Sequence, residues 1–120
     1  LLAAIERIDV FLLPFRRSPL TDAASPVTAY EIMATGRPLV AVPLPELEPF
    51  GDLVRFADDA DGFESRVEAA LREDDPAIVA RRRDFARRNS WEARVDVLER
   101  LVLSLGEAPP GDAARGVGAR

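Results

Sequence analysis

The fold is decided by residues 25–42, which read SPVTAYEIMATGRPLVAV. Ser25 is typical of a helix N-cap, and Pro26 suits the first helical position, where its missing N–H costs nothing. Gly36 predicts the left-handed residue that ends a helix, and the proline two residues later prevents the helix from continuing. The apolar run at residues 39–42 does not alternate with polar residues, as expected of a strand covered on both faces. The stretch therefore predicts a helix of about three turns that leads into a buried strand.

A second apolar run precedes this stretch. Residues 8–13 are mainly apolar and end at Pro14, which predicts a short parallel strand. Together with the loop at residues 14–24, the helix and the next strand, this run forms one βαβ crossover. We therefore expect an α/β fold of three layers, a Rossmann-like parallel sheet with helices on both faces. Ligands of such sheets bind outside the carboxyl ends of the strands, which places the loop and Ser25 in the binding position. The N–H groups and the positive dipole end of the helix there suit a phosphate.

The motif closely resembles the donor-site helix of GT-B glycosyltransferases, above all the retaining group that often reads S-P-x-K-x-x-E-Y-M-A-x-G-x-P-V-V-A. The resemblance runs from about Asp9 to about Leu103, with a second echo at residues 89–92. It implies the C-terminal, donor-binding half of a GT-B architecture, truncated of its first strands. The matching residues are Ser25, Pro26, Val27, Tyr30, Glu31, Met33, Ala34, Gly36, Arg37, Pro38, Leu39, Val40 and Ala41.

In that family a glutamate of this helix holds the ribose hydroxyls of the nucleotide, and Glu31 occupies the matching position. A carboxylate can accept two hydrogen bonds from a vicinal diol. Without the motif, a glutamate on a helix is most often a solvated surface residue, and this alternative stays open. Thr28 shares the helix face of Glu31, at a position where the family often carries lysine. A second glutamate of many members, eight residues before the ribose glutamate, corresponds to Ala23.

The resemblance and the helix dipole together imply phosphate contacts near the helix start. Val27 would offer its backbone N–H there. Capping alone, which contributes about 1 kcal/mol, explains Ser25 equally well. Arg16 is a candidate to replace the family's lysine, because arginine makes charge-assisted bonds to a diphosphate. An exposed, solvated pair of Arg16 and Arg17 is the alternative. The candidate nucleotide contacts are therefore Glu31, Ser25, Pro26, Val27, Thr28 and Arg16.

Composition narrows the functional classes. The chain has 120 residues, 48% hydrophobic and 31% charged, as expected of one ordinary soluble globular domain. A net charge of -5 argues against a dedicated nucleic-acid binder. The absence of cysteine and histidine excludes disulfides, zinc–thiolate sites and histidine-based catalysis. We expect no metal, and discount the D-x-D pattern at residues 59–61 because Asp61 is needed as a helix cap. No apolar run approaches the ~20 residues of a membrane span.

The middle of the chain predicts further elements. Residues 43–51 contain three prolines and predict a loop that crosses the carboxyl edge of the sheet. Residues 53–57 predict a short strand near an edge, because a charged residue interrupts the apolar run. Asp61 and Glu64 have the spacing of a capping box and predict a helix start. Pro76 predicts the first position of the helix that follows.

Ser90 predicts the cap of the last helix, whose apolar stripe is broader than one contact face requires. In GT-B enzymes this helix commonly crosses back to the N-terminal domain, and packing on the preceding helices is the alternative. The arginines at residues 81–83 and 87–88 are expected on one solvated helix face. We expect the domain to span residues 1–105 and residues 106–120 to be disordered. The stripe consists of Trp91, Val95, Leu98, Leu101, Val102 and Leu105.

The resemblance implies transfer of a sugar from a UDP- or GDP-linked donor to a glycan or lipid-linked acceptor, with no separate cofactor. The chain starts in mid-helix without methionine, so we expect an inactive fragment. Its missing partner would be the N-terminal GT-B domain that carries the acceptor site. We expect the parent protein in the cytoplasm, with peripheral association at the inner face of the membrane left open.

The residues do not identify a catalytic acid or base, and two alternative functions stay open. One is a sugar-nucleotide 2-epimerase-like isomerase, which shares the fold, although the arginine expected after the second strand is missing. The other is a non-catalytic nucleotide-sugar-binding or scaffold module, consistent with Ala23 and Thr28.

Overall fold

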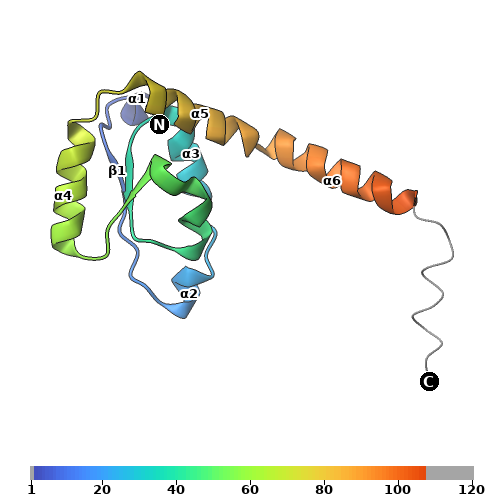
Figure 1. Ribbon diagram of the computed structural model, residues 1–120, viewed down its shortest axis with the longest axis horizontal. Helices are drawn as coiled ribbons and strands as arrows, with labels where there is room; N and C mark the ends of the chain where they lie inside the picture. Colours follow the sequence, from blue (N-terminus) through green and yellow to red (C-terminus); the bar gives the residue numbers. More distant parts are fainter. Residues whose placement is uncertain (1, 108–120) are drawn as a thin grey trace. The chain divides into compact units, whose positions relative to one another are not determined.

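The computed structural model describes residues 2–107 (Figure 1). The chain divides into two compact units, residues 1–88 and residues 89–120. Each unit is described by itself. The elements of the first unit are α1 (Leu2–Ile5), β1 (Phe11–Leu13), α2 (Pro19–Asp22), α3 (Val27–Thr35), β2 (Leu39–Ala41), the 3-10 helix η1 (Pro45–Leu53), β3 (Val54–Phe56), α4 (Ala60–Leu71) and α5 (Pro76–Arg88). The second unit contains α6 (Trp91–Gly106), which includes the first residue of the tail expected at residues 106–120; residues 108–120 of that tail lie outside the described residues.

The first unit is built on a parallel sheet of three strands in the order β1-β2-β3. Leu12 pairs with Val40, and Val40 pairs with Arg55 on the other side. The central strand β2 is completely buried, because α4 covers one face of the sheet and α3, with α5 beside it, covers the other (Figure 1). The predicted α/β fold with a parallel sheet is thereby confirmed. The charged strand β3 was expected nearer an edge than the other two strands; it lies at one edge of the described sheet, but β1 lies at the other edge, so the expectation holds only against β2.

The core lies between α3, the sheet and η1. Ala29, Ile32 and Met33 project from α3 into it. The predicted loop at residues 43–51 is wrong, since most of it is the helix η1, which buries Leu47 and Phe50. Sequence reasoning missed this helix because its prolines indicate a loop, whereas its apolar residues are spaced to face the core.

The start of α3 differs from the prediction by one residue. Pro26, rather than Ser25, occupies the N-cap position, with φ -78 and ψ 86, and no side chain caps the helix. The Ser25 hydroxyl therefore stands one residue outside the helix. A capping box forms earlier, where the Ser18 side chain accepts the N–H of Thr21 and caps the short helix α2. Gly36 ends α3 in the left-handed conformation, with φ 77, as predicted.

The cap of α4 also differs from the prediction. Asp59 is the N-cap, and its Oδ1 accepts the N–H of Gly62 at 2.7 Å. Asp61 lies in the first turn of α4 instead. The expected capping box of Asp61 and Glu64 is therefore wrong, and the cap lies two residues earlier. Pro76 opens α5, and the Ser90 hydroxyl caps α6 by accepting the N–H of Ala93, both as predicted.

The expected solvated arginine face of α5 is wrong at Arg82, whose side chain is completely buried. Its guanidinium donates two hydrogen bonds to the Glu73 carboxylate, at 2.5 and 2.9 Å. It also donates to the carbonyls of Gly36 and Leu53, at 3.2 and 3.1 Å. These carbonyls lie just before β2 and β3, so Arg82 supplies donors at the amino ends of two neighbouring strands. Arg55 donates a further bond to Glu73 at 3.0 Å.

The ion pairs of Glu73 with Arg82 and Arg55 make the free energy of unfolding depend on pH. Burial alone would raise the pKa of Glu73, but the hydrogen bonds and positive charges of Arg82 and Arg55 outweigh it and hold that pKa below the usual 4.5. A carboxyl group with a lowered pKa in the folded state stabilises the fold above its unfolded pKa. That stabilisation is lost as the pH falls through the folded pKa.

We therefore expect Glu73→Gln to be less stable than the wild type at pH 7, with the gap narrowing below about pH 4.5. Urea unfolding between pH 7 and pH 3 measures this gap. The matched control is Glu64→Gln, on the exposed surface of α4. A Glu73→Gln gap that stays constant over the whole range would contradict the role of the Glu73 charge.

Candidate functional site

The candidate site is the edge of the sheet where the three strands end, after Leu13, Ala41 and Phe56. Because the strands are parallel, these ends lie at the same edge. The connection that follows β1 contains α2 and leads into α3, so the start of α3 lies at this edge. The buried cluster of Arg82 and Glu73 lies at the opposite, amino edge. The candidate binding surface and the buried charges therefore lie at opposite edges of the sheet.

Arg17 joins two loops of the carboxyl edge. Its guanidinium donates to the Asp22 carboxylate at 2.7 and 3.3 Å and to the Pro43 carbonyl at 2.7 Å. The hydrogen bond with Asp22 raises the pKa of Arg17 above its usual value. Arg17 therefore ties the segment after β1 to the segment after β2. Sequence reasoning missed this role, although an aspartate five residues later was the available signal.

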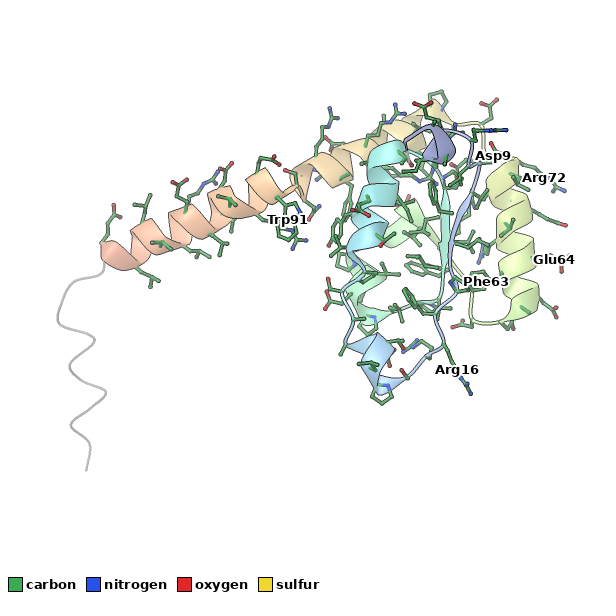
Figure 2. The ribbon with its side chains drawn as sticks, turned by 180° about the vertical axis from the view of Figure 1, so that it is seen from behind. Asp9, Arg16, Phe63, Glu64, Arg72 and Trp91 are labelled. Atoms are coloured by element: carbon green, nitrogen blue, oxygen red, sulfur yellow. The ribbon has the colours of Figure 1, made fainter. Side chains whose placement is uncertain are left out.

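Arg16 has a different environment. Its side chain is exposed and points away from the sheet at the α2 end of the unit (Figure 2). Within residues 2–107 its guanidinium makes no hydrogen bond or ion pair. Its backbone carbonyl accepts the hydroxyl of Thr21 at 2.8 Å, which fixes the loop that carries it. Of the two neighbouring arginines, Arg16 is thus the one whose charge is available to an anion.

Glu31 and Thr28 lie on the exposed side of α3, as predicted. Ala29 and Met33 point the other way, into the core. Glu31 is the fifth residue of α3, about one turn from the helix start. Neither Glu31 nor Thr28 has a side-chain hydrogen bond or ion pair to any residue that the structure describes. The structure therefore presents a carboxylate and a hydroxyl on one accessible face behind the start of α3.

The backbone donors at the start of α3 are only partly available. The N–H of Val27 donates to the Ser25 carbonyl, and the N–H of Ala29 donates to the Pro26 carbonyl, each at 2.9 Å. Val27 thus has no spare N–H, and its half-exposed side chain faces solvent. The N–H of Thr28 has no partner among residues 2–107. The expected cradle of several free amides is therefore reduced to Thr28.

An open depression of about 390 Å³ adjoins these loops at the carboxyl edge. Its walls are mainly apolar, with one carboxylate and the anchored Arg17 guanidinium beside them. Such walls suit a flat base or a sugar ring better than a compact anion. The lining residues are Arg17, Pro43, Leu44, Pro45, Glu48 and Phe56.

Asp59 acts as the cap of α4, so the D-x-D pattern has a structural explanation. In the described part of the chain, no group of three or more acidic, histidine or cysteine side chains is placed to hold a metal ion. None of the helices within residues 2–107 has the length and apolar character needed to cross a membrane. Comparison with known protein families, with curated proteins and with solved structures found no match to the chain.

Proposed function

We propose that this chain is the donor-binding part of a GT-B type glycosyltransferase, and that its carboxyl sheet edge binds a nucleoside-diphosphate sugar. The observation that carries the proposal is Glu31, an exposed carboxylate without a partner in the described chain, one turn behind the start of α3. Its place in the motif of residues 25–42 is that of the ribose-binding glutamate in the resembled family.

Each part of the donor has a counterpart at this edge. Glu31 accepts hydrogen bonds from the two ribose hydroxyls, which a neutral side chain would bind less strongly. Arg16, with the hydroxyl and N–H of Thr28, provides the charge and donors for the diphosphate. The open depression beside Pro43 and Phe56 receives the base or the sugar. In the resembled family the donor lies in the cleft between two domains. We therefore expect this chain alone to bind the donor weakly.

The proposal predicts that Glu31→Ala weakens the binding of uridine or guanosine diphosphate by about 1–3 kcal/mol, the range for leaving polar partners unpaired. Affinity is measured by titration of the full chain followed by NMR, which detects weak binding. Glu68→Ala, at an exposed glutamate of α4, is the matched control and should change nothing.

A second ligand series tests the ribose role itself. Removing both ribose hydroxyls, as in a 2′,3′-dideoxynucleoside diphosphate, should weaken binding to the wild type but not binding to Glu31→Ala. Equal loss in both proteins would contradict the assignment of Glu31. Donor binding in a full-length parent that never transfers sugar would instead favour a non-catalytic binding module.

A further inference from the structure

The second unit presents an apolar helix face that the donor site does not use. Large apolar side chains of α6 are between 54% and 75% exposed. Five of them alternate in steps of four and three residues along 16 residues of helix. Figure 2 labels the first, Trp91. This spacing is the heptad pattern of a helix that packs against another helix, and the exposed Leu101 beside it widens the apolar face. The five residues, here called the α6 seam, are Trp91, Val95, Leu98, Val102 and Leu105.

The residue types at the seam positions indicate which kind of helix the seam packs against. Val95 and Val102 occupy the heptad positions called a, and Trp91, Leu98 and Leu105 occupy the positions called d. Among parallel coiled coils, β-branched residues at a combined with leucine at d, as at Leu98 and Leu105, favour two strands over larger bundles. A helix with this pattern is complementary to a second copy of itself.

Charges beside the seam favour the same arrangement. Arg94 lies at the g position and Glu99, five residues later, at the following e position. In a parallel pair, g of one helix meets the following e of the other, so Arg94 faces the opposite charge of Glu99 twice. In an antiparallel pair, the e positions would face one another. Glu92 of one helix would then lie near Glu99 of the other, and these like charges repel. The Arg94 guanidinium lies 5.9 Å from the centre of the Trp91 ring, which keeps it beside the seam.

We propose that α6 binds a second copy of this chain through the α6 seam, as a parallel two-stranded coiled coil. The seam has only about two heptads, so the dimer forms reversibly at high protein concentration. This proposal is independent of the donor site, since it uses no residue of the carboxyl sheet edge.

Sedimentation equilibrium of the full chain over a wide concentration range tests the dimer. The wild type should shift from monomer to dimer, and Leu98→Lys should stay monomeric. Leu103→Lys, on the opposite side of α6, is the control and should still dimerise. A wild type that remains monomeric throughout overturns the proposal and indicates that another partner or another part of the protein covers the seam.

Two further variants test the orientation. The chain has no cysteine, so Val102→Cys should cross-link to its own copy on mild oxidation, whereas Leu103→Cys should not. Arg94→Glu should raise the dimer dissociation constant by roughly tenfold, because two attractive pairs become repulsive, and adding Glu99→Arg should restore it. Cross-linking of Val102→Cys only to chains that carry cysteine at a d position, such as Trp91→Cys or Leu98→Cys, would show an antiparallel pair and overturn the parallel arrangement.

Discussion

Replacing Arg82 by methionine is expected to lower the free energy of unfolding by about 3–5 kcal/mol, the largest effect of any single side chain considered. The substitution keeps much of the side-chain volume but leaves the Glu73 carboxylate without its main partner. It also removes the donors to the carbonyls of Gly36 and Leu53, at 3.2 and 3.1 Å. The Glu73 carboxylate then keeps only its hydrogen bond from Arg55, and the two carbonyls lose the donors of Arg82, which costs more than the lost attraction alone.

Urea unfolding of Arg82→Met measures this loss, and Arg81→Met is its matched control. Arg81 is the preceding residue of α5 and is paired with Asp52 at 2.7 and 2.8 Å, but that pair is exposed. Exposed pairs contribute little, so Arg81→Met should leave the stability almost unchanged. Combining Arg82→Met with Glu73→Leu should recover part of the loss, because no buried carboxylate is then left without the Arg82 guanidinium. Equal free energies of unfolding for Arg82→Met and Arg81→Met would contradict the stabilising role of the buried contacts of Arg82.

The second large effect is expected at Gly36, where Gly36→Ala should destabilise the fold by roughly 2–5 kcal/mol. A left-handed backbone costs a residue with a Cβ about 1–2 kcal/mol, and φ is 77 at this position. An added Cβ would also lie 2.7 Å from Cγ1 of Val79 and 3.0 Å from Nε of Arg83. Overpacking of this kind typically costs a further 1–3 kcal/mol.

A double variant separates the two causes. Val79→Ala removes the closest atom, so Gly36→Ala should cost less in that background and retain mainly the backbone strain. Gly106→Ala is the control, because nothing lies within 4 Å of a Cβ added at this end of α6. Thermal unfolding of the wild type, the two single variants, the double variant and the Gly106→Ala control gives the comparison. An unchanged cost of Gly36→Ala in both backgrounds would contradict the contact with Val79.

The sequence predicted those features of the fold that local chemistry determines. A glycine two residues before a proline ends α3, a proline opens α5 and a serine caps α6, because each needs only its own neighbours. The cap of α4 was misplaced because Asp59 and Asp61 are equivalent in sequence, and only the path of the chain decides between them. Arg82 could not be predicted, since its burial depends on carbonyls 29 and 46 residues away.

The candidate site was predictable to a similar extent. The exposure of Glu31 and Thr28 followed from helix periodicity, because the apolar residues of α3 face the core. The different environments of Arg16 and Arg17 could not be predicted from the sequence. Arg17 donates a hydrogen bond to the Pro43 carbonyl after β2, and no local pattern reveals this contact. The engagement of the Val27 N–H likewise depends on where the helix begins, which the sequence placed one residue too early.

The binding of a nucleoside diphosphate at the carboxyl edge is the central claim, and mapping backbone amide shifts in the full chain tests it most directly. Millimolar uridine and guanosine diphosphate are added separately to isotope-labelled protein. At least one should shift the amides of residues 14–31, with Thr28 among the most affected, because its N–H is unpaired in the described chain. Absence of shifts with both ligands would contradict the claim. So would shifts concentrated around Arg37 and Arg83, which line a cavity of about 440 Å³ at the amino edge.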